Sequence, residues 1–206
     1  MTSLTIPTPH GPAHVELHDG QHRGAALLLG HGAGGSTSAP DLAAATRAAS
    51  TVGMQVALVT QPYRVAGRRA ASPARQLDEA WLAVVRFLAD GVFTGLPLIF
   101  GGRSSGARVA CRTAAPGGAA AVLCLAFPVH PPGRPDRSRI SELEAVDVPV
   151  LVVQGERDPF GRPEPDAGRE VVLLPGDHSL KADLTALERV VGGWLQGRVQ
   201  ALTHRL

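Results

Sequence analysis

The sequence predicts a single α/β domain, in which a mainly parallel sheet carries helices on both faces. Short apolar runs alternate with amphipathic or capped segments to the end of the chain, a pattern typical of parallel strands joined by crossover helices. No internal repeat divides the sequence, and only residues 131–139 resemble a linker. A length of 206 residues suits one domain with a sizeable core, so we expect one domain over residues 1–206.

The first elements follow from local patterns. Alternating apolar and polar residues at 15–17 predict an antiparallel edge strand, with residues 4–6 as its partner. Residues 27–30 are apolar and predict the first parallel strand. The segment Ser38-Ala39-Pro40-Asp41 has a capping pattern, which predicts a helix from there to about Ser50. Residues 55–60 predict the next strand.

Apolar residues at helical spacing predict an amphipathic helix over residues 72–89. The remaining strands are expected at residues 96–100, 120–127, 148–153 and 170–174, and the remaining helices at residues 105–115, 140–146 and 182–202. Only about a dozen residues separate the strand at 120–127 from the next helix. That connection is too short for a lid domain, so we expect an open cleft.

The segment Gly102-Arg103-Ser104-Ser105-Gly106 lies between a predicted strand and a predicted helix. A strand, a sharp turn with a serine at its apex and a helix make up a nucleophile elbow. The turn passes so close to its surroundings that the residues two positions either side of the serine must be small, and Gly102 and Gly106 meet this need. Ser104 as an ordinary helix N-cap is the alternative.

A nucleophilic serine needs a base, and the base needs an orienting acid. Asp158 follows the strand predicted at 148–153, and His178 lies between the last strand and the last helix. Glu156 and Asp177 compete with Asp158 for the role of the acid. Asp177 adjoins the histidine and would have to turn back onto its ring, so we favour Asp158.

An oxyanion hole needs two backbone N–H donors fixed in advance. Ser105, the residue after the nucleophile, would supply one at the start of a helix. The glycine-rich loop from His31 to Ser36 would supply the other, from Ala33 or alternatively Gly34. We interpret His31 as a brace of this loop.

With these segments in place, the chain resembles the α/β-hydrolase superfamily, and within it the small, lid-less group similar to dienelactone hydrolases. The resemblance begins near Gly24. It implies the fold and the catalytic order Ser104, Asp158, His178, but dienelactone hydrolases proper use a cysteine nucleophile. Their ring-opening activity is therefore not carried over. The matching segments are residues 31–35, 102–106, 127–133, 154–161 and 176–178.

Several residues at the expected carboxyl ends of strands are candidates for the substrate pocket. They are Tyr63, Arg64, Phe127, His130 and Phe160. Arg64, Arg68 and Arg69, helped by Arg103, form a hypothetical clamp for an anionic substrate. A solvated loop is the favoured interpretation of that arginine segment.

Composition excludes several classes of function. The net charge of +2 gives no reason to expect a nucleic-acid partner, and neither a signal peptide nor a membrane span is evident. We expect a cytoplasmic protein in which Cys111 and Cys124 are buried free thiols. His14, His18 and His22 recur every four residues, but Gly20 and Gly24 argue against a helix there, so we expect no metal site.

The sequence therefore predicts a serine hydrolase that cleaves an ester, thioester or related acyl bond of a small molecule without a cofactor. A non-catalytic interaction module is one alternative. An acyltransferase or perhydrolase using the same residues is another. The acyl chain, the leaving group and the oligomeric state stay open.

Overall fold

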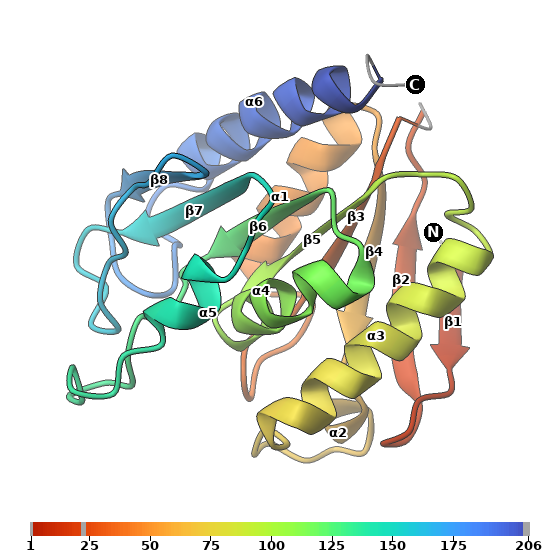
Figure 1. Cartoon of the computed structure of the whole chain (residues 1–206), viewed down its shortest axis with the longest axis horizontal. Helices are drawn as coiled ribbons and strands as arrows, with labels where there is room; N and C mark the ends of the chain where they lie inside the picture. The colour runs from red at the N-terminus through yellow and green to blue at the C-terminus, as the bar shows by residue number, and fades with distance from the viewer. Residues whose placement is uncertain (1, 22–23, 204–206) are drawn as a thin grey trace.

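The computed structural model of this protein describes residues 2–21 and 24–203. Figure 1 shows a central twisted sheet with helices on both of its faces. The strands are β1 (Thr2–Ile6), β2 (Ala13–His18), β3 (Ala26–Gly30), β4 (Gln55–Thr60), β5 (Leu98–Arg103), β6 (Ala121–Leu125), β7 (Val150–Gly155) and β8 (Arg169–Leu174). The helices are α1 (Pro40–Thr51), α2 (Pro62–Val65), α3 (Ala74–Asp90), α4 (Ser105–Gly117), α5 (Ile140–Glu144) and α6 (Leu184–Thr203).

Among the described residues, eight strands form one sheet in the order β1-β2-β4-β3-β5-β6-β7-β8. The pairs β1–β2 and β2–β4 are antiparallel, and every later pair is parallel. The carboxyl ends of the parallel strands β3 to β8 all lie on one side of the sheet, and ligand-binding sites form at such ends in folds of this kind. The predicted fold class is confirmed.

One predicted strand forms at the expected residues, but its predicted place at the edge of the sheet was wrong. The strand expected at residues 15–17 is β2, and it pairs with both β1 and β4, so the edge strand is β1. The hairpin itself forms as expected, with His14 and His18 on β2. His22 lies outside the described residues.

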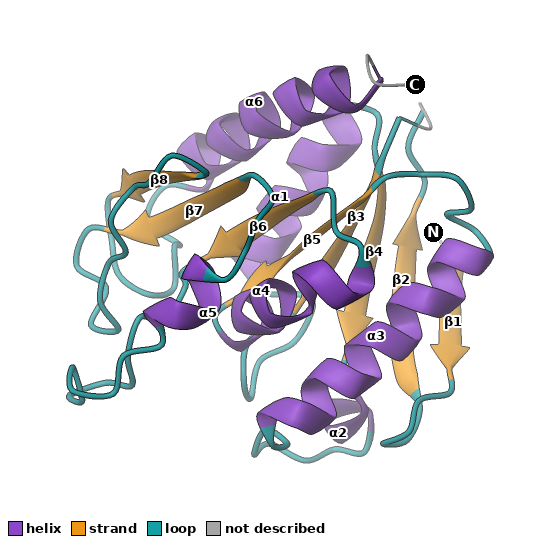
Figure 2. Ribbon diagram, in the orientation of Figure 1, coloured by secondary structure: helices purple, strands orange, loops and turns teal. Residues whose placement is uncertain are grey.

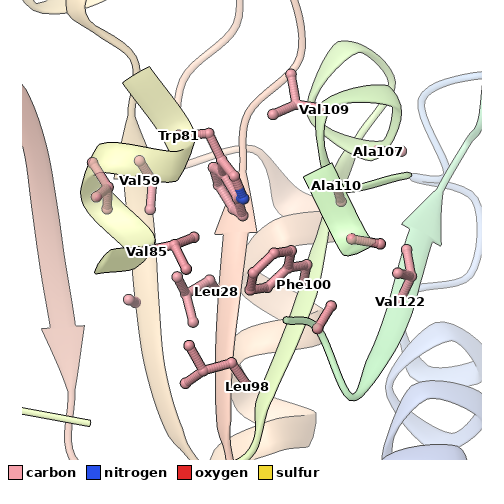
Figure 3. Packing of buried hydrophobic residues seen from close by; sticks show 14 of the residues in the cluster. Leu28, Val59, Trp81, Val85, Leu98, Phe100, Ala107, Val109, Ala110 and Val122 are labelled. Atoms are coloured by element: carbon pink, nitrogen blue, oxygen red, sulfur yellow. The ribbon is translucent and has the colours of Figure 1, made fainter. Parts of the chain in front are cut away.

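Helices cover both faces of the sheet (Figure 2), and a layer of buried hydrophobic residues lies between the sheet and the helices on each face. On one face α3 and α4 pack against the strands, and on the other α1 and α6 do so. In the first layer, the ring of Trp81 meets that of Phe100 edge-on with centroids 5.8 Å apart, and Leu28 and Val85 lie beside them (Figure 3). Ala107, Val109 and Ala110 of α4 belong to the same cluster, so this layer holds α4, and with it the turn that precedes α4, against the middle of the sheet.

The helix α1 does not begin as its capping pattern predicts. Ala39 occupies the N-cap, and no side chain caps the helix. Asp41 is fully buried and forms an ion pair with Arg103. The pattern was misleading because the carboxylate serves a contact between two distant segments instead of its own helix.

The loop between β6 and α5, residues 126–139, contains neither helix nor strand. No lid element is therefore inserted there in the described part of the chain. Across residues 2–21 and 24–203, none of the helices combines the length and apolar character needed to cross a bilayer. The same ranges hold no cluster of three or more His, Cys, Asp or Glu side chains suited to a metal ion.

Candidate active site

The turn between β5 and α4 holds Ser104 in a backbone conformation that side chains rarely adopt. Ser104 has φ 53° and ψ −109°, and such a conformation costs a non-glycine residue roughly 1–3 kcal/mol. A Cβ on Gly102 would lie 2.6 Å from the carbonyl oxygen of Gly30, and one on Gly106 would lie 2.3 Å from the same atom. Glycine at both positions lets the turn pass tightly against β3 and leaves Ser104 at the surface of a cleft.

The hydroxyl of Ser104 does not cap the helix that it precedes. It lies 2.9 Å from Nε2 of His178, and Nδ1 of His178 lies 2.8 Å from Oδ2 of Asp158. Because a carboxylate accepts hydrogen bonds, Nδ1 carries the proton and Nε2 is left to accept one from the hydroxyl. The parallel strands β5, β7 and β8 bring these three residues together from widely separated parts of the chain.

Two hydrogen bonds hold the carboxylate of Asp158, in addition to the one with His178. Its Oδ1 accepts a hydrogen bond of 2.8 Å from the backbone N–H of Phe160, and its Oδ2 accepts one of 2.8 Å from the amide of Gln154. Gln154 is itself fully buried and also donates to the carbonyls of Phe127 and Gly161. These contacts fix the carboxylate opposite the ring of His178.

The two competing acids do not reach the histidine. Glu156 is exposed to solvent, and the carboxylate of Asp177 accepts hydrogen bonds from the backbone N–H and hydroxyl of Ser179. Those two bonds hold the pKa of Asp177 below its ordinary value. Among the three acids considered from the sequence, only Asp158 contacts His178.

Ala33 and Ser105 line the same cleft as Ser104. The loop that carries Ala33 contains a turn in which the N–H of Gly35 donates to the carbonyl of Gly32. His31 braces this loop from below, since its Nε2 accepts from the N–H of Gln61 and its Nδ1 donates to the carbonyl of Gly32. Burial lowers the pKa of His31, so the imidazole stays neutral, as this bonding pattern requires.

Arg103 connects the elbow to the histidine loop, a role that sequence reasoning missed. Its Nε lies 2.8 Å from Oδ2 of Asp41, and its Nη2 donates to the backbone carbonyl of His178 at 3.2 Å. Burial raises the pKa of Asp41, and the charge of Arg103 opposes that rise. Arg103, the residue before Ser104 in the elbow, therefore helps to position His178 through this hydrogen bond, while the ion pair with buried Asp41 fixes the guanidinium.

The pocket residues predicted from the sequence divide into two groups. Phe160 lines the cleft beside Ser104, and its ring stacks on that of His178 with centroids 4.0 Å apart. The others lie elsewhere in the described structure. Tyr63 and Phe127 are buried in the core, His130 donates to the carbonyl of Pro131 and lines a neighbouring hollow, and Arg64 donates to the carbonyl of Arg68.

The structure does not bring the arginines of the hypothetical clamp, Arg64, Arg68, Arg69 and Arg103, together at the cleft. The short helix α2 folds Arg64 back onto its own loop, and Arg68 and Arg69 are exposed. Arg103 is held by Asp41 and by the carbonyl of His178. None of these four arginines is among the described residues that line the cleft.

Three other arginines do line the cleft, namely Arg108 and Arg112 of α4 and Arg139 before α5. Sequence reasoning missed these arginines. The spacing of four residues from Ser104 to Arg108, and of four more to Arg112, nevertheless places Ser104, Arg108 and Arg112 on one face of a helix. The cleft has a volume of about 280 Å³. A larger hollow of about 680 Å³ between α1, β2 and β4 contains none of Ser104, Asp158 and His178.

A family model described as an alpha/beta hydrolase domain matches residues 23–186, most of the chain. The chain belongs to the alpha/beta hydrolase family. No curated protein sequence matches it. Ser104 lies in the turn between the strand β5 and the helix α4, an arrangement typical of a nucleophile elbow.

Solved structures of this family share the fold over nearly their whole length. An alpha-beta serine hydrolase homologue from Coxiella burnetii is 17% identical with a TM-score of 0.78, covering 94% of this chain and 97% of its own. A serine hydrolase without a lid from Xanthomonas campestris is 24% identical with a TM-score of 0.69, covering 99% and 94%. A dienelactone hydrolase from Anabaena variabilis is 19% identical with a TM-score of 0.77, covering 95% and 96%. The resemblance to lid-less, dienelactone-hydrolase-like members is confirmed.

The two cysteines lie beneath the site. Cys111 of α4 and Cys124 of β6 are buried free thiols whose Sγ atoms are 3.5 Å apart. The hydrogen bond with Cys124, together with burial, raises the pKa of Cys111 well above its ordinary value. The thiolate form of Cys111 is therefore disfavoured, and both sulfurs are buried.

Proposed function

We propose that this protein is a serine hydrolase that cleaves an ester, thioester or related acyl bond through an acyl-enzyme intermediate. Ser104 is the nucleophile, His178 the general base and acid, and Asp158 the residue that orients His178. The observation that carries the proposal is the continuous chain of hydrogen bonds from Asp158 through His178 to Ser104, with lengths of 2.8 and 2.9 Å.

In the first step, the hydroxyl oxygen of Ser104 attacks the substrate carbonyl while its proton moves to Nε2 of His178. The ring becomes positively charged at that moment, and Asp158 stabilises the charge through Nδ1–H. His178 then gives the same proton to the leaving group as the acyl-enzyme forms. A water molecule activated by His178 releases the acyl group in the second half of the cycle.

The negative charge that develops on the carbonyl oxygen is bound by the backbone N–H groups of Ala33 and Ser105. Loss of one such donor costs about 3 kcal/mol in related chemistry. The start of α4 adds a favourable dipole, because Ser105 is the first residue of that helix. These groups supply every role that acyl transfer needs, so the proposal includes no metal and no cofactor.

A single domain over residues 1–206 carries the reaction in this proposal, acting on a small-molecule substrate without a nucleic-acid or membrane partner. We also propose a cytoplasmic location, which the two free thiols support. Transfer to an alcohol or to peroxide would use the same residues. Product analysis with a competing alcohol or with hydrogen peroxide separates those reactions from hydrolysis.

The proposal is tested with a panel of aryl esters and acyl thioesters. The wild-type protein is expected to hydrolyse at least one class, and Ser104→Ala is expected to lose at least 10³-fold in kcat. Ser3→Ala is the matched control, because Ser3 is an exposed serine on the edge strand β1 and its loss should leave turnover unchanged. Equal turnover by Ser104→Ala and wild type would refute the assignment.

A further inference from the structure

The cleft next to Ser104 is lined by three arginines, and the described acids neutralise only two of them. Arg108 binds Glu142 through two nitrogens at 2.8 and 2.5 Å. Arg112 binds Asp78 in the same way at 2.8 and 2.6 Å and also reaches Glu142 at 3.2 Å. Burial alone would raise the pKa of Glu142, but the bonds to these arginines lower it overall, so Glu142 is a charged partner of both.

Arg139 is the third arginine, and its guanidinium has no such partner within residues 2–21 and 24–203. The ion pairs and side-chain hydrogen bonds in those ranges involve Arg108 and Arg112 but not Arg139. Its backbone, in contrast, is fixed, because its N–H donates to the carbonyl of Val129 at 2.7 Å and its carbonyl accepts from Glu142. The backbone of Arg139 is thus fixed, and its side chain lines the cleft without an acidic partner among the described residues.

An uncommitted guanidinium at this place is electrostatically unfavourable without a ligand. Partial burial and the neighbouring charges of Arg108 and Arg112 lower the pKa of Arg139, and the charge of Glu142 opposes this only in part. The lining residues of the cleft include three arginines and no acid among the described residues. With Asp78 and Glu142 counted, the surroundings carry an excess of one positive charge, which an anionic substrate would neutralise.

We propose that Arg139 binds a carboxylate of the substrate, so that the preferred substrates are small acyl compounds that carry one carboxylate besides the bond to be cleaved. This inference rests on the proposed hydrolase function and deepens it. A guanidinium matches a carboxylate through two parallel hydrogen bonds. An excess of one charge fits a monoanionic carboxylate better than a phosphate dianion.

The spacing of residues along α4 guides the length of the probe. Arg108 lies four residues beyond Ser104, which corresponds to roughly 6 Å along a helix axis, and the arginine cluster begins there. The volume of the cleft, about 280 Å³, is slightly below that of the smallest typical ligand pockets, about 300 Å³. A six-carbon diacid ester spans this separation and fits this volume, so adipate half-esters are suitable probes.

The test compares esters that differ only in the charge of one group. Mono-4-nitrophenyl adipate and 4-nitrophenyl hexanoate present a carboxylate or a methyl at the end of the acyl chain. The pair 4-acetoxybenzoate and methyl 4-acetoxybenzoate presents a carboxylate or its methyl ester on the leaving-group side. The wild-type protein is expected to favour the carboxylated member of at least one pair by about 10-fold or more in kcat/KM.

Arg139→Gln is expected to reduce that ratio to about 1, mainly through a higher KM for the carboxylated ester, and Arg139→Lys to restore part of it. Arg137→Gln is the matched control, because Arg137 lies on the same loop but is exposed and outside the cleft. It should leave the ratio unchanged. An absence of preference in the wild type, or an equal loss of preference in both glutamine variants, would overturn the inference.

A binding measurement separates this inference from the proposed function. The Ser104→Ala protein, which cannot form an acyl-enzyme, is titrated calorimetrically with monomethyl adipate, alone and with the added change Arg139→Gln. We expect binding that weakens at least 10-fold in the double variant. Equal binding by the two proteins overturns the role of Arg139 even if neutral esters are hydrolysed, whereas failure to hydrolyse any ester overturns the proposed function.

Discussion

Removal of the Arg103 side chain is expected to leave a buried carboxylate without its counter-charge. Asp41 is 0% exposed and the Arg103 side chain 21% exposed, with 2.8 Å between Nε and Oδ2. At an effective dielectric constant of about 20, two unit charges at this distance attract by about 6 kcal/mol, before desolvation is counted. Breaking one partner of such a pair typically costs about 3–5 kcal/mol, a large fraction of the stability of a domain.

The loss is also expected to depend on pH, with a sign that follows from the pKa of Asp41. Burial raises that pKa above the ordinary value of 3.8, and Arg103 opposes the rise, so Arg103→Ala raises it further. A carboxyl with a raised folded-state pKa contributes stability below its unfolded pKa and loses it as pH rises through the folded pKa. The deficit of Arg103→Ala should therefore be small near pH 4 and should grow as the pH rises toward 7.

Urea unfolding followed by tryptophan fluorescence measures this directly, since Trp81 and Trp194 are buried on opposite faces of the sheet. At pH 7 we expect Arg103→Ala to lose about 3–5 kcal/mol and the double variant with Asp41→Asn to recover most of it. A deficit that does not vary with pH, or a double variant whose losses simply add, would refute the reasoning.

Three further predictions concern the elbow, the acid and the thiols. Gly106→Ala should destabilise the protein by about 3 kcal/mol or more in thermal unfolding, because the new Cβ would lie 2.3 Å from a carbonyl oxygen of β3. Gly193→Ala is the control and should not destabilise the protein, because a Cβ at Gly193 would meet open space. Equal effects of the two substitutions would contradict the close-approach argument. Asp158→Asn should lower kcat by about 10⁴-fold with an ester substrate, whereas exposed Glu156→Gln should retain activity; an active Asp158→Asn would mean that another acid serves. Cys111 and Cys124 should react with a thiol reagent only after unfolding, and rapid labelling of the native protein would show that they are accessible.

The parts of the site that could be predicted from sequence are those encoded in short segments. A serine between two glycines at a strand–helix junction predicts an elbow because the steric demand is local, and the contacts of Gly102 and Gly106 with Gly30 agree with it. The strand β5 nevertheless runs to Arg103, beyond the predicted end at residue 100. Glycines have low strand propensity, but here small residues are required by the close packing of α4 and β6 against β5.

The parts that could not be predicted depend on contacts between distant segments. Nothing in the local sequence of Asp41 distinguishes a helix cap from the partner of Arg103, which lies 62 positions further along the chain (103 − 41). Arg139 has no distinctive neighbours in the sequence either, and its importance appears only when the charges of Arg108 and Arg112 are balanced against Glu142 and Asp78. The place of Arg64 outside the cleft lining could not be predicted for a similar reason, because its partner is a backbone carbonyl that only the fold of α2 brings near.

The central claim is that the hydrogen bonds from Asp158 through His178 activate Ser104. The measurement that tests it most directly is treatment of the pure protein with a fluorophosphonate probe, followed by mass-spectrometric mapping of the adduct. We predict one adduct on Ser104, absent in Ser104→Ala and formed far more slowly in His178→Ala. An unmodified, folded wild-type protein, or an adduct that forms equally fast without His178, would contradict the claim.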